Sequence, residues 1–255
     1  MAKVIFLGTA ASIPSKDRDT TSFVFIHKGC FSLIDCPGSI IHKLAIVGID
    51  YKKLDKVILT HDHPDHIYGI FHLIHAQAYL TKKLYIFTNP PVISLIKKMT
   101  GLLKLNKVPF PKLCYVNVFG GKMFYAKDGL TLSAVKNKHS YQSFGVKFSF
   151  NKQSLLYSSD TALFDGIIKE SKNCEWLIHD CTASASFFEQ HPSLYTMHTD
   201  SFTLADRFKN SRLKKVIPIH FLPLAREEEK NLKKELSLLK NKLLIPRDFQ
   251  TIQLK

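Results

Sequence analysis

Short apolar runs separated by polar turns dominate the first half of the chain. Runs of this length and composition predict buried strands, and a glycine at position 29 predicts a hairpin between the second and third of them. The predicted strands cover residues 3–7, 22–26, 30–34, 56–60 and 85–87. Three further segments repeat their apolar positions at helical spacing, namely 40–47, 67–80 and 91–99.

The second half continues the alternation of strands and helices. Strands are predicted over 130–135, 146–150, 154–159, 176–179, 215–219 and 249–254, and helical segments around 167–168, 203–208 and 226–244. Residues 101–121, which mix lysines, prolines and aromatic residues, fit either a basic mobile excursion or a helix-loop-strand connection. Since strands and helices alternate in both halves, we predict an α/β protein. The expected architecture is a four-layer αββα sandwich of two mixed sheets with outer helices, as a single domain over residues 1–255.

The chemistry concentrates in one stretch directly after the predicted strand at 56–60. It contains His61, His63, Asp65 and His66 within six residues, with Pro64 suited to the first position of a helix. Imidazole and carboxylate are ligands for zinc and manganese, so this stretch predicts half of a site for divalent metals. Other imidazole and acidic residues also follow predicted strands, which would collect them along one edge of a sheet: Asp35, Asp160, Asp180 and His220.

The composition narrows the class of protein. The net charge of +15 indicates an affinity for polyanions such as nucleic acid, although a general excess of lysine would produce the same value. Five cysteines without CxxC spacing favour a reduced, cytoplasmic protein. We expect no membrane association, because the N-terminus lacks a secretory apolar segment and no apolar run is long enough to span a bilayer.

Residues 61–66 read His-Asp-His-Pro-Asp-His, which resembles the HxHxDH motif of the metallo-β-lactamase superfamily. A lone His139, then Ser159-Asp160-Thr161, then His220 follow in the order that this superfamily uses. Within it, the chain is most similar to ribonuclease Z, the tRNA 3′-processing endonuclease. The segments that carry this resemblance are Phe6-Leu7-Gly8-Thr9, Pro14 to Arg18, His139-Ser140 with Phe144-Gly145, Leu177 to Thr182, His198-Thr199 and His220-Phe221.

The resemblance implies the metallo-β-lactamase fold and a dinuclear hydrolase. One metal would bind His61, His63 and His139, a second would bind Asp65, His66 and His220, and Asp160 would bridge them. The metals would be zinc, with manganese or iron as alternatives. A hydroxide between the metals would attack phosphorus, Asp65 would orient or deprotonate that water, and His198, held by Asp180, would protonate the leaving 3′-oxygen.

The function that we predict from this resemblance is the endonucleolytic removal of 3′ trailers from tRNA precursors, and hydrolysis of a small phosphodiester is the alternative. The substrate in the first case is a tRNA precursor, from which a ribonuclease Z would remove the 3′ trailer, acting as a homodimer. In the second it is a small phosphodiester such as a cyclic nucleotide, an alternative that arises because the interval between His139 and Asp160 is too short for the long tRNA-gripping arm of many ribonuclease Z proteins. Residues 101–121 are a hypothetical substitute for that arm. The chain also departs from the family at Asp180, where glutamate is usual, and at Met197, where glycine is common. A binding module on a decayed scaffold is a third interpretation, opposed by the complete ligand set.

Overall fold

The computed structural model describes residues 2–139 and 142–255, which form two compact units. The first unit comprises residues 1–9, 17–119 and 247–255, and the second comprises 10–16 and 120–246. The chain therefore leaves the first unit after its first strand, returns at residue 17, and comes back to it for its last strand. Ser140, which belongs to one of the motifs above, lies outside the described residues.

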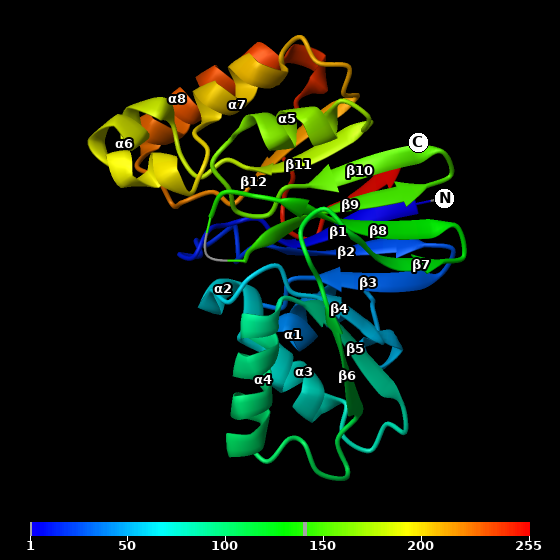
Figure 1. Ribbon diagram of the computed structural model, residues 1–255. Helices are drawn as coiled ribbons and strands as arrows, with labels where there is room; N and C mark the ends of the chain where they lie inside the picture. The colour runs from blue at the N-terminus through cyan, green and yellow to red at the C-terminus, as the bar shows by residue number, and fades with distance from the viewer. Residues whose placement is uncertain (1, 140–141) are drawn as a thin grey trace. The chain divides into compact units, whose positions relative to one another are not determined.

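The first unit is built on a seven-stranded mixed sheet (Figure 1). Its order is β13 (Thr251–Leu254), β1 (Ala2–Gly8), β2 (Ser22–His27), β3 (Cys30–Ile34), β4 (Lys56–Ile58), β5 (Lys83–Thr88) and β6 (Lys112–Asn117). The pairs from β13 to β3 are antiparallel, and the pairs from β3 to β6 are parallel. The carboxyl ends of the parallel strands therefore meet at one edge of the sheet, where the loop after β4 carries His61 and His63.

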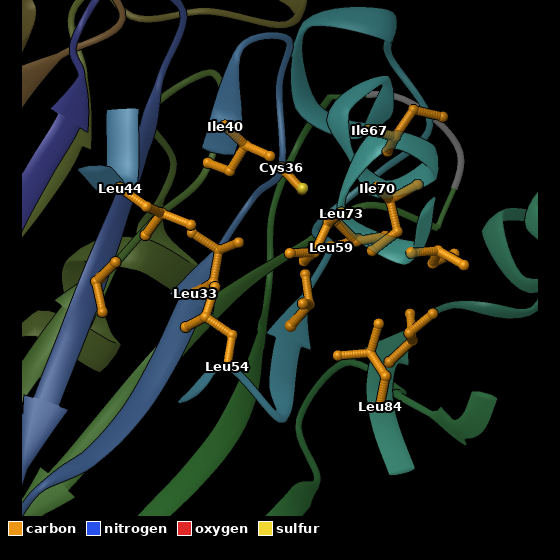
Figure 2. Close-up of a cluster of buried hydrophobic side chains, with 14 of the residues drawn as sticks. Leu33, Cys36, Ile40, Leu44, Leu54, Leu59, Ile67, Ile70, Leu73 and Leu84 are labelled. Atoms are coloured by element: carbon orange, nitrogen blue, oxygen red, sulfur yellow. The ribbon is translucent and has the colours of Figure 1, made fainter. Parts of the chain in front are cut away.

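Helices pack against this sheet through an aliphatic core. They are α1 (Ile40–Ile46), α2 (Pro64–Ile67), α3 (Gly69–Ala76) and α4 (Pro90–Leu102), with a 3₁₀ turn η1 (Tyr51–Lys53). Figure 2 shows Ile40 and Leu44 of α1 in the same cluster as Leu33 of β3 and Leu73 of α3. All four side chains are fully buried, and burying each contributes about 1.5–3 kcal/mol to stability.

The second unit has a six-stranded mixed sheet with its own helices. The order is β12 (Lys215–Ile219), β11 (Trp176–Asp180), β10 (Gln153–Tyr157), β9 (Phe144–Phe150), β8 (Leu130–Lys136) and β7 (Met123–Lys127). The first two pairs are parallel and the other three antiparallel. The helices are α5 (Asp165–Ser171), α6 (Ala185–Gln190), α7 (Ser201–Phe208) and α8 (Arg226–Leu236), with 3₁₀ segments η2 (Pro192–Thr196) and η3 (Ser237–Lys242). Leu204, Phe208, Leu232 and Leu236 join a core with Leu177 and Val216 of the sheet.

These elements confirm the prediction of an α/β protein with two mixed sheets and helices. Residues 101–121 form the end of α4, a turn and β6, so the helix-loop-strand interpretation is correct. The helix predicted over 67–80 corresponds to α3, which follows α2 after a break at Tyr68 and ends at Ala76, before a left-handed Tyr79. Within the part of the chain that is described, no helix has the length and apolar character needed to cross a membrane.

The predicted helix over 226–244 is too long. The α-helix ends at Leu236, and a 3₁₀ segment follows in which Lys240 adopts a left-handed φ of 52°. The chain turns there because Leu243 forms a parallel bridge with Val216, which a continuing helix could not reach. Strand β7 and helix α6 were not predicted. Strand β7 has no fully buried residue, so its apolar pattern is weak.

Candidate active site

The first unit presents four candidate ligands at the carboxyl end of β4. His61 and His63 lie in the loop after the strand, and Asp65 and His66 lie in α2, which begins at Pro64 as predicted. The His61 ring lies 4.6 Å from the His63 ring and 4.2 Å from the His66 ring, measured between centroids. The Oδ2 atom of Asp65 lies 3.5 Å from Nε2 of His66. The structure thus brings the four predicted residues of this unit together.

A buried aspartate orients two of these rings. Asp35 follows β3 and accepts hydrogen bonds from the Thr60 amide (2.9 Å), the Thr60 hydroxyl (3.0 Å) and Nδ1 of His66 (3.0 Å). Because the Thr60 hydroxyl has one hydrogen and donates it to Asp35, it must accept from Nδ1 of His61, 2.9 Å away. Both imidazoles therefore carry their proton on Nδ1, which leaves the Nε2 lone pair for a metal.

The junction between α2 and α3 is hydrogen-bonded to the segment that follows β3. The Cys36 amide donates to the His66 carbonyl, and the Gly69 amide donates to the Cys36 carbonyl, both at 2.7 Å. A Cβ atom on Gly69 would lie 1.9 Å from the Pro37 carbonyl oxygen, so only glycine allows this approach. The helix that carries Asp65 and His66 is therefore held by the same segment that supplies Asp35.

The second unit collects the other candidates at the ends of its strands. The Oδ2 atom of Asp160, just after β10, lies 3.0 Å from Nε2 of His220, which follows β12. The same oxygen lies 3.9 Å from Nε2 of His139, which follows β8. One carboxylate oxygen thus faces two imidazole nitrogens. His198 joins them, since its ring lies 5.0 Å from the His139 ring and 5.1 Å from the His220 ring.

Asp180 has the same role in the second unit as Asp35 has in the first. It accepts hydrogen bonds from the Thr161 amide (3.0 Å), the Thr182 hydroxyl (2.8 Å) and Nδ1 of His198 (2.7 Å). The Thr182 hydroxyl also lies 3.1 Å from Nδ1 of His220. Because its one hydrogen is donated to Asp180, the hydroxyl oxygen must accept a hydrogen bond from Nδ1 of His220. Asp180 is long enough to reach His198, so the substitution of aspartate for the glutamate usual at this position does not break the contact.

The pKa values of Asp180 and His139 in the second unit are shifted in directions that fit a charged hydrogen-bond acceptor and a neutral imidazole. Burial alone would raise the pKa of Asp180, but the charge and hydrogen bond of His198, with His220 nearby, hold this pKa below its usual value. Burial lowers the pKa of His139 and outweighs the opposing effects of Asp160 and of the Met197 carbonyl, which lies 3.0 Å from Nδ1. His139 is therefore neutral near pH 7, as metal ligation requires.

Three residues that turn the chain out of its strands have left-handed backbones although none is glycine. Asp35 has a φ of 55°, Ser159 of 56° and His220 of 66°. Such a conformation costs an L-residue on the order of 1 kcal/mol, and it persists only where the surrounding structure imposes it. Here it turns the chain sharply at a strand end, where Asp35 and His220 are themselves site residues and Ser159 precedes Asp160.

Sequence reasoning does not assign Asp35, Thr60 and Thr182 to the site. It identifies Asp35 only as an acidic residue after a strand, and the two threonines only as parts of motifs. A threonine adjacent to a predicted ligand, combined with an aspartate after an apolar strand, is the signal that could have found Thr60 and Asp35. Thr182 has no such neighbour and lies two residues after the predicted Asp180. The partners themselves come from distant segments, since Asp35 and His66 are 31 residues apart and Thr182 and His220 are 38 apart.

Replacing Thr182 with valine should weaken metal binding by about 10- to 100-fold. The change keeps the shape of the side chain and removes the hydroxyl that fixes the Nδ1 tautomer of His220. Competition with a chromophoric chelator measures the affinity, and Thr182→Ser, which keeps the hydroxyl, is the matched control. Equal affinities of the valine and serine variants would contradict this assignment.

The residues present fit divalent metals. Each unit offers imidazoles whose Nδ1 atoms are engaged, together with an aspartate next to an Nε2 atom, Asp65 in the first unit and Asp160 in the second. Neutral, oriented imidazole combined with carboxylate is the donor set of catalytic zinc sites and also serves manganese and iron. This fit rests on the chemistry of the donors within each unit.

Comparisons with known proteins agree with the fold. The model of the family described as anti-Pycsar protein Apyc1 matches residues 2–240. A ribonuclease Z of Bradyrhizobium sp. (strain ORS 278) is 31% identical over 152 residues, which cover 58% of this chain and 50% of the relative. The match thus spans about half the length of that relative.

Solved structures with the same fold cover almost the whole chain. The metallo-β-lactamase fold protein YhfI from Bacillus subtilis has a TM-score of 0.83 at 21% identity and covers 98% of both chains. Human tRNase Z, short form, has a TM-score of 0.78 at 18% identity over 99% of both chains. A diphosphatase from the PhnP family has a TM-score of 0.79 at 17% identity, over 100% of this chain and 98% of that one. With two mixed sheets, strand-end histidines and a family model that spans nearly all of it, this chain is a metallo-β-lactamase-fold protein and belongs to the family of the anti-Pycsar protein Apyc1.

Proposed function

We propose that this protein is a dinuclear metal-dependent phosphodiesterase. One metal would be held by His61, His63 and His139, and a second by Asp65, His66 and His220, with Asp160 between them. Zinc is the metal proposed, with manganese and iron as alternatives. When bound, the metals would supply an ionised water near neutral pH and neutralise charge on the phosphate. The oriented donors within each unit support this assignment.

The observation that carries the proposal is the position of His198. Within the second unit its ring lies beside those of His139 and His220, and its Nδ1 atom is held by Asp180 at 2.7 Å. An imidazole in that position, with its Nδ1 atom engaged by a carboxylate, is suited to protonate a leaving alkoxide. During hydrolysis a P–O bond forms to water and the bond to the leaving oxygen breaks, and His198 would supply the proton that oxygen needs. Asp65 would orient or deprotonate the attacking water.

Small phosphodiesters, including cyclic nucleotides, are the substrate class that we favour. Strands β9 and β10 pair from Phe150 and Gln153, with only Asn151 and Lys152 in the turn, both left-handed. A two-residue turn of this kind is the tightest hairpin connection. The long arm that many ribonuclease Z proteins insert between the third histidine motif and the bridging aspartate therefore has no place among the described residues of this hairpin.

Removal of 3′ trailers from tRNA precursors is the second candidate. The net charge of +15 and the similarity to ribonuclease Z support it. A cytoplasmic homodimer is part of this second candidate, and sedimentation would establish the oligomeric state.

One experiment separates the two candidates. Protein reconstituted with zinc or manganese is given a panel of cyclic mononucleotides and, separately, a 3′-extended tRNA precursor, and kcat/KM is measured for each. We expect ring opening of at least one cyclic nucleotide and no trailer release. Trailer release without cyclic nucleotide turnover would select the second candidate, and a fully metallated protein inactive on both would contradict phosphodiesterase function.

A further inference from the structure

A long segment of the chain contains no acidic residue. Residues 66–127 hold nine lysines and neither aspartate nor glutamate, although the chain has 21 acidic residues in all. A general preference for lysine would add cations without removing the carboxylates. The segment therefore accounts for +9 of the net charge of +15. Its lysines are Lys82, Lys83, Lys97, Lys98, Lys104, Lys107, Lys112, Lys122 and Lys127.

The fold of the first unit gathers several of these lysines around two hollows. One hollow, of about 440 Å³, is lined by Lys97 of α4, Lys107 of the following turn and Lys112 of β6. The other, of about 580 Å³, is lined by Lys82 and Lys83 and shares Lys112 with the first. No carboxylate lines either hollow among the described residues. Figure 1 shows the connection from α4 to β6 that supplies much of both linings.

Aromatic rings are interleaved with these cations. Phe110 lines both hollows, Tyr115 lines the first, and Tyr79 lines the second with 83% of its surface exposed. The Lys97 ammonium lies 5.3 Å above the Tyr115 ring. We name this set the lysine-aromatic surface: Tyr79, Lys83, Lys97, Lys107, Phe110, Lys112 and Tyr115.

The surface is held in shape by contacts beneath it. The Tyr79 amide donates to the Pro109 carbonyl at 2.6 Å, and the Phe110 ring lies 5.8 Å from the His75 ring. Leu105, in the turn between α4 and β6, is buried in the aliphatic core. The Lys82 ammonium donates hydrogen bonds to the Lys52 and Leu54 carbonyls. Because it is engaged in this way, Lys82 is not counted as part of the lysine-aromatic surface.

We propose that the lysine-aromatic surface binds single-stranded nucleic acid. Exposed lysines would pair with successive phosphates, and the rings in the hollows would stack with bases. A second copy of the chain fits poorly, because like charges would face each other across the contact. Val108 also lines both hollows and is 95% exposed, so an anionic membrane surface is the competing partner, and the vesicle measurement below tests it. The proposal concerns an anionic partner of the first unit and holds whichever phosphodiester is hydrolysed.

Fluorescence anisotropy of the full-length protein with a labelled single-stranded RNA of about 12 nucleotides tests the proposal. The variant Lys97→Gln/Lys107→Gln/Lys112→Gln should bind at least about tenfold more weakly. Its plot of log affinity against log salt should also be shallower by about 2, at roughly 0.7 for each phosphate that a lysine no longer pairs with. Tyr79→Ala should weaken binding about fivefold or more with an unchanged salt slope, because stacking is not ionic. All three lysines and Tyr79 are exposed, so thermal unfolding should not change.

A matched variant in the second unit controls for net charge. Lys152→Gln/Lys169→Gln/Lys172→Gln removes three exposed lysines and should leave RNA affinity unchanged. Equal weakening by both triple variants would overturn the proposal, because binding would then follow net charge alone. Binding to vesicles containing anionic lipid, or to an acidic polypeptide, without binding to RNA would overturn it as well. Hydrolysis of a small phosphodiester by the first triple variant should equal that of the unchanged protein, so this test does not depend on the proposed catalytic function.

Discussion

Replacing His198 with alanine is expected to lower kcat for an alkyl phosphodiester by about 10²–10⁴-fold, the usual contribution of general acid catalysis. Its Nδ1 atom is held by Asp180 at 2.7 Å, so the ring is oriented before substrate arrives. An alkoxide is a strongly basic leaving group and needs the proton. A nitrophenolate leaves without one, so the variant should hydrolyse a nitrophenyl phosphodiester at close to the normal rate.

The comparison of leaving groups distinguishes a proton donor from a metal ligand. The imidazole of His198 also lies within 4.8 Å of potential ligand atoms of Asp160 and His220, so ligation is the competing role. If His198 were a ligand, His198→Ala would lose metal and slow both substrates equally. Metal analysis of the variant, alongside the two rate measurements, decides between these roles. Full retention of metal with a selective loss on the alkyl substrate is the result we expect.

Replacing Asp160 with asparagine should have the largest effect on metal content. Its Oδ2 atom faces Nε2 of His220 at 3.0 Å and Nε2 of His139 at 3.9 Å, so one oxygen serves two imidazoles. An amide oxygen carries no charge and cannot bridge two cations as a carboxylate does. Bound metal should fall from two equivalents to one or fewer. Activity should fall by at least about 10³-fold, because metals contribute several kcal/mol to the transition state and each 1.4 kcal/mol is tenfold.

Elemental analysis after reconstitution and dialysis measures this effect. Asp128→Asn is the matched control, since it makes the same chemical change at an exposed residue of the second unit whose left-handed φ of 53° asparagine tolerates. The control should retain both metals and full activity. Two metals in the Asp160→Asn protein would contradict the bridging role, and one equivalent or less in the unchanged protein would contradict the dinuclear proposal.

Both units hold their histidine rings with the same pattern of hydrogen bonds. In each, a buried aspartate accepts from a threonine hydroxyl and from Nδ1 of one histidine, while the threonine oxygen accepts from Nδ1 of another histidine. The aspartates are Asp35 and Asp180, and the threonines are Thr60 and Thr182. This repeated pattern places the proton on Nδ1 of four histidines: His61, His66, His198 and His220. The identities of the ligands alone do not reveal these tautomers.

The sequence by itself determined the elements whose signals are local. The run before His61 and the proline at position 64 specify a strand, a loop and a helix start within ten residues, because each depends on neighbouring side chains and backbone geometry. The motif at 61–66 and the order of the later histidines likewise indicated the superfamily before any contact was known.

Only the tertiary structure decided which distant residues complete each half of the site. Sequence periodicity carries no information on pairs such as Asp35 with His66 or Thr182 with His220, because such contacts depend on strand order and on left-handed turns at strand ends. A tertiary contact also ends the helix predicted over 226–244 early, because the bridge from Leu243 to Val216 overrides helical preference. The tertiary structure also gathers lysines of α4, β5 and β6 around two hollows, and net charge alone could not locate this group.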